Sequence, residues 1–141
     1  MIFEHRVRVR FYQADPAGVL YFGRVFELVG DAYEELLRQA GVDVDALLRL
    51  EEHATPIVHA EADFKRPMRV GEEIVVRATV ERVGESSVAV AYTLEGTDGK
   101  LRATARVVHV WIEGQNFRKV SIPEGIRAIL AGLVDAEARS Q

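Results

Sequence analysis

The sequence predicts an α+β fold in which one long helix packs on an antiparallel sheet of about five strands. Residues 25–40 carry apolar side chains at three- and four-residue spacing, which is typical of an amphipathic helix. Other segments alternate apolar with polar residues or are rich in valine, which is typical of strands. Since the helix directly follows the first strand, we expect it to cross one face of the sheet.

The first expected strand covers residues 2–11. Three apolar residues alternate there with three arginines, so one face is expected to be buried and the other charged. The alternating residues are Arg6, Val7, Arg8, Val9, Arg10 and Phe11. We interpret the arginine face as a solvated strand face in preference to a ladder of phosphate-binding groups.

A tight Asp-Pro-Ala-Gly turn lies between this strand and the long helix. Pro16 biases Asp15 away from helical dihedrals, and Gly18 allows the backbone to turn sharply or to approach a ligand. Turn chemistry alone explains these residues as a type I turn with aspartate first and proline second. The same arrangement holds a carboxylate at the start of a helix, which Gly41 is placed to end.

The remaining elements are shorter. Thr97–Lys100 contains an Asp-Gly pair typical of a hairpin turn, and Pro123 is placed to start a final helix. In order, we expect a short helix within 42–53, strands at 54–64, 74–83, 88–94 and 101–113, a helix after 123, and a polar tail from 136. Ala89 and Ala91 are small residues on one strand face, which indicates contact with another sheet or subunit.

Composition limits the possible functions. With 141 residues the chain fits one domain, residues 1–141. A net charge of −4 argues against general nucleic-acid binding, and the charged N-terminal segment is expected to be neither a signal peptide nor a membrane anchor. The absence of cysteine excludes disulfides and thiol nucleophiles, and is compatible with the cytoplasmic location that we expect.

The segment from the first strand to the long helix resembles a known family. The pattern F-x-x-x-D-P-A-G-x-x-x-F, followed by Asp-Ala in the helix, is similar to that of the 4-hydroxybenzoyl-CoA thioesterase family of hotdog-fold proteins, including the Tol–Pal-associated acyl-CoA thioesterases. The matching residues are Phe11, Asp15, Pro16, Ala17, Gly18, Phe22, Asp31 and Ala32. A second, weaker match is the Thr-Pro-Ile-Val string at residues 55–58.

The resemblance implies a hotdog fold and acyl-CoA thioester hydrolysis without a metal or redox cofactor, coenzyme A being part of the substrate. It implies that Asp15 acts as general base or as nucleophile, and the residues do not choose between these roles. The backbone N–H groups of Phe22 and Gly23 are expected to polarise the thioester carbonyl. Hotdog relatives form homodimers and often homotetramers, with sites at the dimer interface.

Substrate-binding residues follow from the same resemblance. Aromatic residues beside the helix are expected to shape the acyl pocket, and basic residues to bind the phosphates of coenzyme A. The candidates are Tyr21, Thr55, Val58, Lys65, Arg66 and Arg82. Relatives with a basic cluster in the loop between the third and fourth strands would place it near residues 83–85, where this chain has none.

Two alternatives to a thioesterase remain open. One is a non-catalytic acyl-CoA or acyl-carrier-protein binding module on the same fold, in which Asp15 is only a turn residue. The other is a hotdog dehydratase or hydratase, which lacks support because no paired histidine and acidic residue is evident near the helix. The four histidines show no metal-ligand spacing, so no metal site is expected.

Overall fold

The structure, a computed structural model, describes residues 2–49 and 53–134. Its main sheet has five antiparallel strands in the order β1-β4-β5-β6-β3. They are β1 (Ile2–Arg8), β3 (Ile57–Phe64), β4 (Glu73–Val83), β5 (Ser87–Gly96) and β6 (Leu101–Val110). Two short strands, β2 (His53–Ala54) and β7 (Ile112–Glu113), pair with each other.

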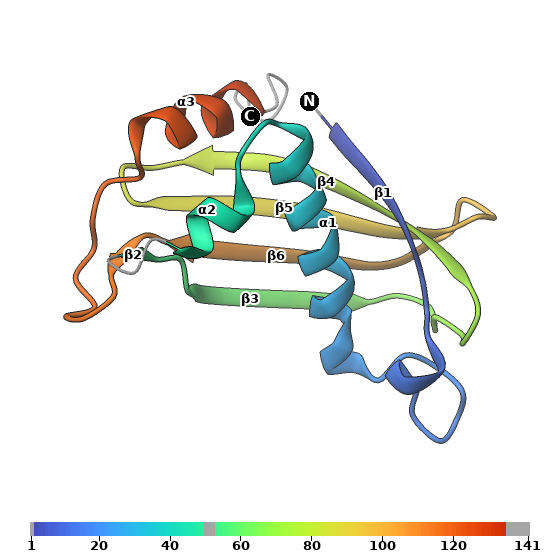
Figure 1. Cartoon of the computed structure of the whole chain (residues 1–141). Coiled ribbons are helices and arrows are strands. Elements are labelled where there is room, and N and C mark those ends of the chain that lie inside the picture. Colours follow the sequence, from blue (N-terminus) through green and yellow to red (C-terminus); the bar gives the residue numbers. More distant parts are fainter. Residues whose placement is uncertain (1, 50–52, 135–141) are drawn as a thin grey trace.

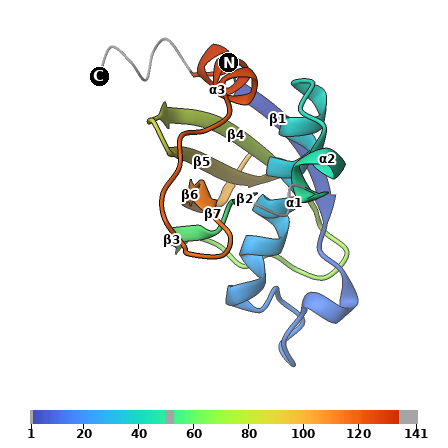
Figure 2. The same cartoon turned by 60° about the vertical axis from the view of Figure 1, so that its left-hand side comes forward.

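Three α-helices accompany the sheet: α1 (Val25–Gln39), α2 (Val44–Arg49) and α3 (Glu124–Gly132). Helix α1 lies across one face of the sheet, with α2 beside it, and α3 contacts β4 (Figures 1 and 2). The apolar stripe of α1 faces the sheet, as the sequence predicts. Its buried residues are Val25, Leu28, Val29, Ala32, Leu36 and Leu37. This is the hotdog architecture expected from the resemblance.

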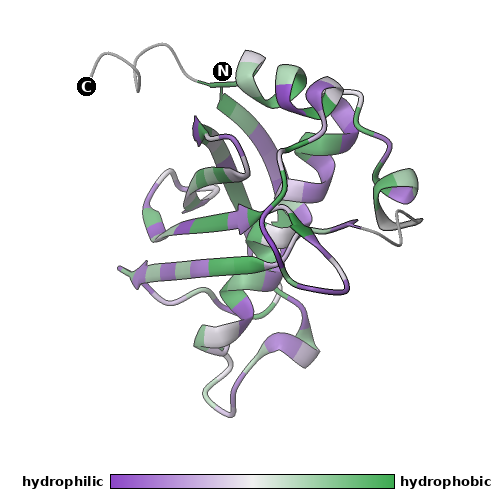
Figure 3. Cartoon of the chain, turned by 90° about the vertical axis from the view of Figure 1, so that its left-hand side faces the viewer, coloured by the Kyte–Doolittle hydropathy of each residue, from purple (hydrophilic) through white to green (hydrophobic). Residues whose placement is uncertain are grey.

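The sheet presents a buried face to α1 and a more polar face to the other side. On β5 the residues at the even positions 88–94 are almost fully buried, while Ala91 and Thr93 between them are half-buried. Figure 3 shows the same alternation of hydrophobic and hydrophilic residues along the strands. The two-residue period of the strands therefore determines which side chains meet the helix.

Three segments differ from the sequence prediction. Strand β1 ends at Arg8, because the chain turns where the Gln13 N–H donates to the Arg10 carbonyl at 3.0 Å. The strand expected at 54–64 is divided, because Pro56 has no N–H to donate. The strand expected at 101–113 is likewise divided at Trp111, where β6 gives way to β7. The predicted polar tail lies outside the described residues.

The two outer strands of the sheet are unequal. Strand β1 is flanked by α1, whereas β3 has β6 on one side and no strand on the other. Along β3 the apolar side chains of Ile57, Val58 and Phe64 are 56%, 59% and 47% exposed. The described part of the chain thus leaves an apolar strand edge without a covering partner. Within the same residues, no helix is long and apolar enough to cross a bilayer.

Candidate active site

Asp15 opens a tight hairpin that the sequence predicts as a turn. Its N–H donates to the Val19 carbonyl at 2.9 Å, and the Gly18 N–H donates to the Asp15 carbonyl at 3.0 Å. Gly18 has φ +80°, a conformation that favours glycine. The turn interpretation is therefore correct, and it fixes the position of the carboxylate.

The Asp15 side chain is anchored through one oxygen only. Its Oδ1 accepts the Ala17 N–H at 2.9 Å and the Val19 N–H at 3.4 Å. Within the described residues no hydrogen bond or ion pair to Oδ2 is recorded. The half-buried carboxylate is thus oriented by the backbone and keeps one oxygen available for a proton or a carbonyl carbon.

The start of the helical segment supplies hydrogen-bond donors. A single 3₁₀ turn, Phe22–Arg24, precedes α1, and the Arg24 N–H donates to the Tyr21 carbonyl at 2.9 Å. The N–H groups of Phe22 and Gly23 come before this first intrahelical bond, and the described part of the chain provides no recorded acceptor for either. These two N–H groups are therefore the candidates that the sequence analysis expects to polarise a thioester carbonyl.

Aromatic side chains surround these donors. Tyr21 and Phe22 are 49% and 64% exposed, and their ring centroids lie 4.8 Å apart. A Cβ atom at Gly23 would come within 3.2 Å of the Tyr21 ring. Glycine at position 23 therefore allows the tyrosine ring to lie close to the backbone beside the donors.

Two of the predicted substrate-binding residues, Lys65 and Arg66, lie beside the Asp15 hairpin. The Leu20 N–H donates to the Met68 carbonyl at 2.7 Å, which joins the hairpin to the loop after β3. A cavity of about 280 Å³ between these segments is lined by Val19, Leu20, Phe64, Lys65, Arg66, Pro67 and Met68. The Arg66 guanidinium also donates to the Leu101 carbonyl at 2.7 Å, which holds it at this end of the sheet.

The other predicted substrate-binding residues lie at the opposite end of the sheet. Phe64 pairs with Ala103 and Ile57 with His109, so the two ends of β3 are about 20 Å apart. Thr55 and Val58 are at the far end. Arg82 lies at the same far end, because it pairs with Ala89, which pairs with Val108, which pairs with His59. A single chain therefore does not bring Thr55, Val58 and Arg82 to Asp15.

The sequence analysis missed Gln13, which is 5% exposed and lies two residues before Asp15. Its side chain connects the hairpin to α1 through Glu27, fourteen positions further along the chain. No periodic pattern predicts such a contact. The only available signal is an amide side chain in a segment that must be buried beneath the turn.

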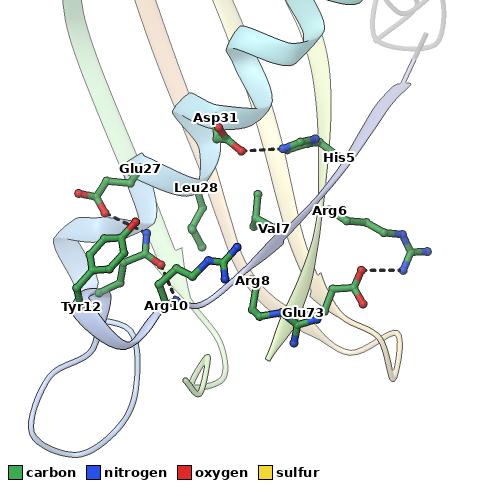
Figure 4. Close-up of a pocket in the computed structure, with 11 residues that line it drawn as sticks. His5, Arg6, Val7, Arg8, Arg10, Tyr12, Glu27, Leu28, Asp31 and Glu73 are labelled. Carbon is green, nitrogen blue, oxygen red and sulfur yellow. Dashed lines mark hydrogen bonds and ion pairs between the residues drawn. The ribbon is translucent and has the colours of Figure 1, made fainter. Parts of the chain in front are cut away.

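A larger cavity of about 510 Å³ lies between β1 and α1, on the side of the helix away from β3. Figure 4 shows two pairs of side chains in its lining: His5 is hydrogen-bonded to Asp31, with Nε2 2.7 Å from Oδ2, and Arg6 lies beside Glu73. The arginine residues of β1 are exposed, as predicted for a solvated strand face. Within the described residues no group of three or more acidic or histidine side chains is placed to hold a metal ion.

The ring of Tyr33 in α1 stacks on the ring of His109 in β6. The Tyr33 and His109 centroids are 4.4 Å apart with an interplanar angle of 12°, and His109 Nδ1 lies 3.5 Å from the Thr55 carbonyl oxygen. Burial lowers the pKa of His109 below its ordinary value of 6.5, and the Thr55 carbonyl opposes this only in part. The ring is therefore neutral at pH 7.

We expect this histidine to make the fold sensitive to acid. Below pH 6.5 the unfolded chain binds a proton at His109 that the folded chain resists, so the free energy of unfolding falls as the pH drops. The His109→Phe variant keeps a ring against Tyr33 and should lose this part of the dependence. Denaturant titrations of the parent and the variant from pH 8 to pH 5 measure it. An unchanged dependence in His109→Phe would contradict the assignment.

Gly18→Ala should destabilise the hairpin by about 1–2 kcal/mol, because an L residue is strained at this positive φ. No atom lies within 4 Å of the added Cβ, so backbone strain is the only cost. Gly30→Ala, in the exposed middle of α1, also meets no atom and should stabilise by about 1 kcal/mol. Thermal unfolding of both variants tests this pair, and equal effects would argue against the strained turn.

The five-stranded antiparallel sheet with α1 across one face defines a class, that of hotdog-fold proteins. The thioesterase-like superfamily model matches residues 9–130. The chain therefore belongs to the thioesterase-like superfamily. This confirms the resemblance at the level of the superfamily, and the predicted class of enzyme, an acyl-CoA thioester hydrolase.

Individual relatives agree with this assignment. The 1,4-dihydroxy-2-naphthoyl-CoA hydrolase of Rippkaea orientalis is 30% identical over 92% of this chain and 95% of its own length. The enzyme of that name from Nostoc punctiforme is 32% identical over 89% of this chain and 84% of its own. The crystal structure of a 1,4-dihydroxy-2-naphthoyl-CoA thioesterase from Synechocystis matches with a TM-score of 0.88 at 25% identity, covering 94% of this chain and 98% of that one.

Proposed function

We propose that this protein hydrolyses aromatic acyl-CoA thioesters at a site formed by Asp15 and the N–H groups of Phe22 and Gly23. The observation that carries the proposal is the pairing of a carboxylate held through one oxygen with two donors that have no recorded acceptor in the described chain. A thioester carbonyl between them meets both an electrophilic and a basic group. The proposed reaction uses no metal or redox cofactor.

In the proposed reaction, Asp15 removes a proton from a water molecule, and the resulting hydroxide adds to the thioester carbonyl carbon. The carbonyl oxygen becomes an oxyanion, which accepts hydrogen bonds from Phe22 and Gly23. Each such donor typically contributes about 3–4 kcal/mol of barrier lowering. The tetrahedral intermediate then collapses, the C–S bond breaks, and coenzyme A leaves as a thiolate that takes up a proton.

A nucleophilic role for Asp15 gives the same products. The carboxylate would attack the carbonyl carbon and expel the thiolate, and water would hydrolyse the mixed anhydride. A single turnover in H₂¹⁸O identifies the nucleophilic route when water attacks the aspartyl carbon of the anhydride. The general-base route places ¹⁸O in the released acid, whereas attack of water on the aspartyl carbon of the anhydride leaves ¹⁸O in Asp15.

An aromatic acyl group suits the side chains around the site. Tyr21 and Phe22 expose large ring surfaces beside the donors, and the partly buried Phe26 follows about one helical turn later. Aromatic rings pack favourably against one another in offset or edge-to-face arrangements. The relatives named as 1,4-dihydroxy-2-naphthoyl-CoA hydrolases act on a fused aromatic acyl group, which supports the same class here.

We propose that the active form is a homodimer joined through β3. The β3 edge carries exposed Ile57, Val58 and Phe64 and has no strand on its outer side among the described residues. A second copy is the occupant that the geometry favours, since antiparallel pairing about the middle of β3 is self-complementary. It would extend the sheet across both copies and cover the apolar edge.

This pairing would complete the site. It places the beginning of β3 in one copy opposite its end in the other, and hence Thr55 and Val58 of one copy near Asp15 of the other. Lys65 and Arg66, beside the Asp15 hairpin, are proposed to bind coenzyme A phosphates of their own site. Arg82, at the far end, would serve the site of the neighbouring copy. Association into tetramers and a cytoplasmic location stay predictions.

Thiol release from a panel of aliphatic, benzoyl, hydroxybenzoyl and dihydroxynaphthoyl thioesters of coenzyme A tests the proposed function. We expect the largest kcat/KM for an aromatic thioester. Preference for hydroxybenzoyl-CoA would support the narrower resemblance to the 4-hydroxybenzoyl-CoA thioesterase family. Preference for a long aliphatic chain would contradict the aromatic pocket, and tight binding without thiol release would favour the non-catalytic binding module.

A further inference from the structure

We propose that Gln13 is a positioning residue, which holds Asp15 in register with the oxyanion-stabilising N–H groups of Phe22 and Gly23. The inference rests on the proposed function, because it assigns Gln13 a task only if those groups act together. Asp15 lies on the hairpin and the donors lie at the helix start, so their separation depends on what joins the two segments.

The polar atoms of Gln13 are satisfied by three separate parts of the chain. Its Oε1 accepts the Arg10 N–H at 2.9 Å, which closes the turn before Asp15. Its Nε2 donates to Glu27 Oε1 at 3.1 Å, in the first turn of α1. Its carbonyl oxygen accepts the Tyr21 N–H at 2.9 Å, directly before the first donor residue. One residue thus joins the segments before and after the hairpin.

Because Gln13 is buried, the loss of any of its hydrogen bonds costs free energy. Within the described residues Gln13 is the one buried side chain, aromatic rings aside, that carries polar atoms, and it is 5% exposed. A buried amide must keep its hydrogen bonds, because water cannot replace them. The hairpin and the helix start therefore cannot shift relative to each other without breaking a contact that has no substitute.

The acceptor on α1 is itself held in place. Glu27 Oε2 accepts the Arg24 guanidinium at 2.8 Å, and Arg24 belongs to the 3₁₀ turn that contains both donor residues. Figure 4 shows Glu27 reaching toward the segment of Arg10 and Tyr12 at the end of the β1–α1 cavity. Successive hydrogen bonds therefore connect Arg10, Gln13, Glu27 and Arg24. They link the segment that leads into Asp15 with the 3₁₀ turn that carries the two donor N–H groups.

Exchanging the donor and acceptor side chains of the Gln13–Glu27 hydrogen bond distinguishes a positioning role of Gln13 from a contribution to packing alone. Gln13→Glu sets a second carboxylate against Glu27, which breaks the contact by repulsion. Adding Glu27→Gln restores it, because the amide introduced at position 27 donates to the carboxylate introduced at position 13, which still accepts the Arg10 N–H. The double variant keeps the number of charges and the side-chain sizes of the parent.

The experiment measures kcat and KM for an aromatic acyl-CoA, with thermal unfolding in parallel. For Gln13→Glu we expect kcat to fall about 10- to 100-fold with KM changed much less, since small misplacements of reacting groups have effects of this size. The double variant should recover most of kcat. Gln39→Glu, at the exposed end of α1, is the matched control and should behave as the parent.

Three results would overturn the inference. The first two concern a folded Gln13→Glu variant: parental kcat, or a raised KM with kcat unchanged. The third is a double variant that regains stability but not kcat. Asp15→Asn, assayed beside these variants, separates this inference from the proposed function. If Asp15→Asn is fully active, the site itself is wrong. If Asp15→Asn is inactive while Gln13→Glu is unaffected, the site stands and only the positioning role fails.

Discussion

Asp15→Asn is expected to reduce kcat for thioester hydrolysis by about 10²- to 10⁴-fold, the usual contribution of a general base. The amide oxygen can still accept the Ala17 and Val19 N–H groups that the carboxylate accepts at Oδ1. The hairpin should therefore keep its shape, and the loss should come from the chemistry. Steady-state thiol release measures the change.

Two measurements on Asp15→Asn show whether its loss of activity comes from the chemical step. Its thermal unfolding should match that of the parent, and an aromatic acyl-CoA should still bind, because the aromatic and basic side chains are unchanged. As a control, Asp43→Asn replaces a carboxylate that likewise accepts a backbone N–H, that of Ala46, but beyond the opposite end of α1 from the proposed site, and should leave kcat unaltered. An Asp15→Asn variant with parental turnover would remove the proposed role of this carboxylate.

Mixing two inactive variants is expected to restore activity if the site is shared between copies. Asp15→Asn disables the carboxylate, and Val58→Arg should obstruct the acyl pocket of the neighbouring copy. In a randomly exchanged 1:1 mixture half of the dimers are mixed, and each mixed dimer keeps one intact site. About a quarter of the parental activity should therefore return, as the symmetry of a twofold dimer requires.

The recovery depends on exchange of subunits, so the mixture is made by co-expression or by refolding together. Size-exclusion chromatography with light scattering should show a dimer for each variant alone. Val58 is 59% exposed in one chain, so arginine there leaves the fold of the single chain unaffected. If Val58→Arg is inactive and the mixture is inactive too, Val58 and Asp15 of the same copy form one site, which would contradict a site shared between copies. An active Val58→Arg dimer would mean that Val58 does not line the site.

The fold is predictable from the sequence because its signals are local. The 3.6-residue period of α1 and the two-residue period of β5 each reflect which side chains meet the core. The strand boundaries that the sequence predicts wrongly depend on hydrogen bonds that a periodic pattern does not reveal. Strand β1 ends early because residues 10–13 form a hydrogen-bonded turn, and the last long strand breaks at Trp111. Local periodicity carries no information about either event.

The candidate site is predictable only in part, for a similar reason. Asp15, Phe22 and Gly23 stand in one continuous motif, so a resemblance suffices to identify them together. Gln13 escapes such analysis because its role comes from its contact with Glu27 across the fold. Thr55, Val58 and Arg82 were grouped with Asp15 in sequence, yet one chain places them at the opposite end of the sheet. In the proposed dimer, a second copy would bring them to the site.

The most direct test of the central claim is thiol release from one aromatic acyl-CoA with enzyme in excess over substrate, for the parent and Asp15→Asn side by side. This condition measures binding and the first chemical step without product release. The account predicts one equivalent of thiol released rapidly by the parent, and bound but intact thioester with the variant. Equal release by both proteins, or intact bound thioester with the parent, would contradict it.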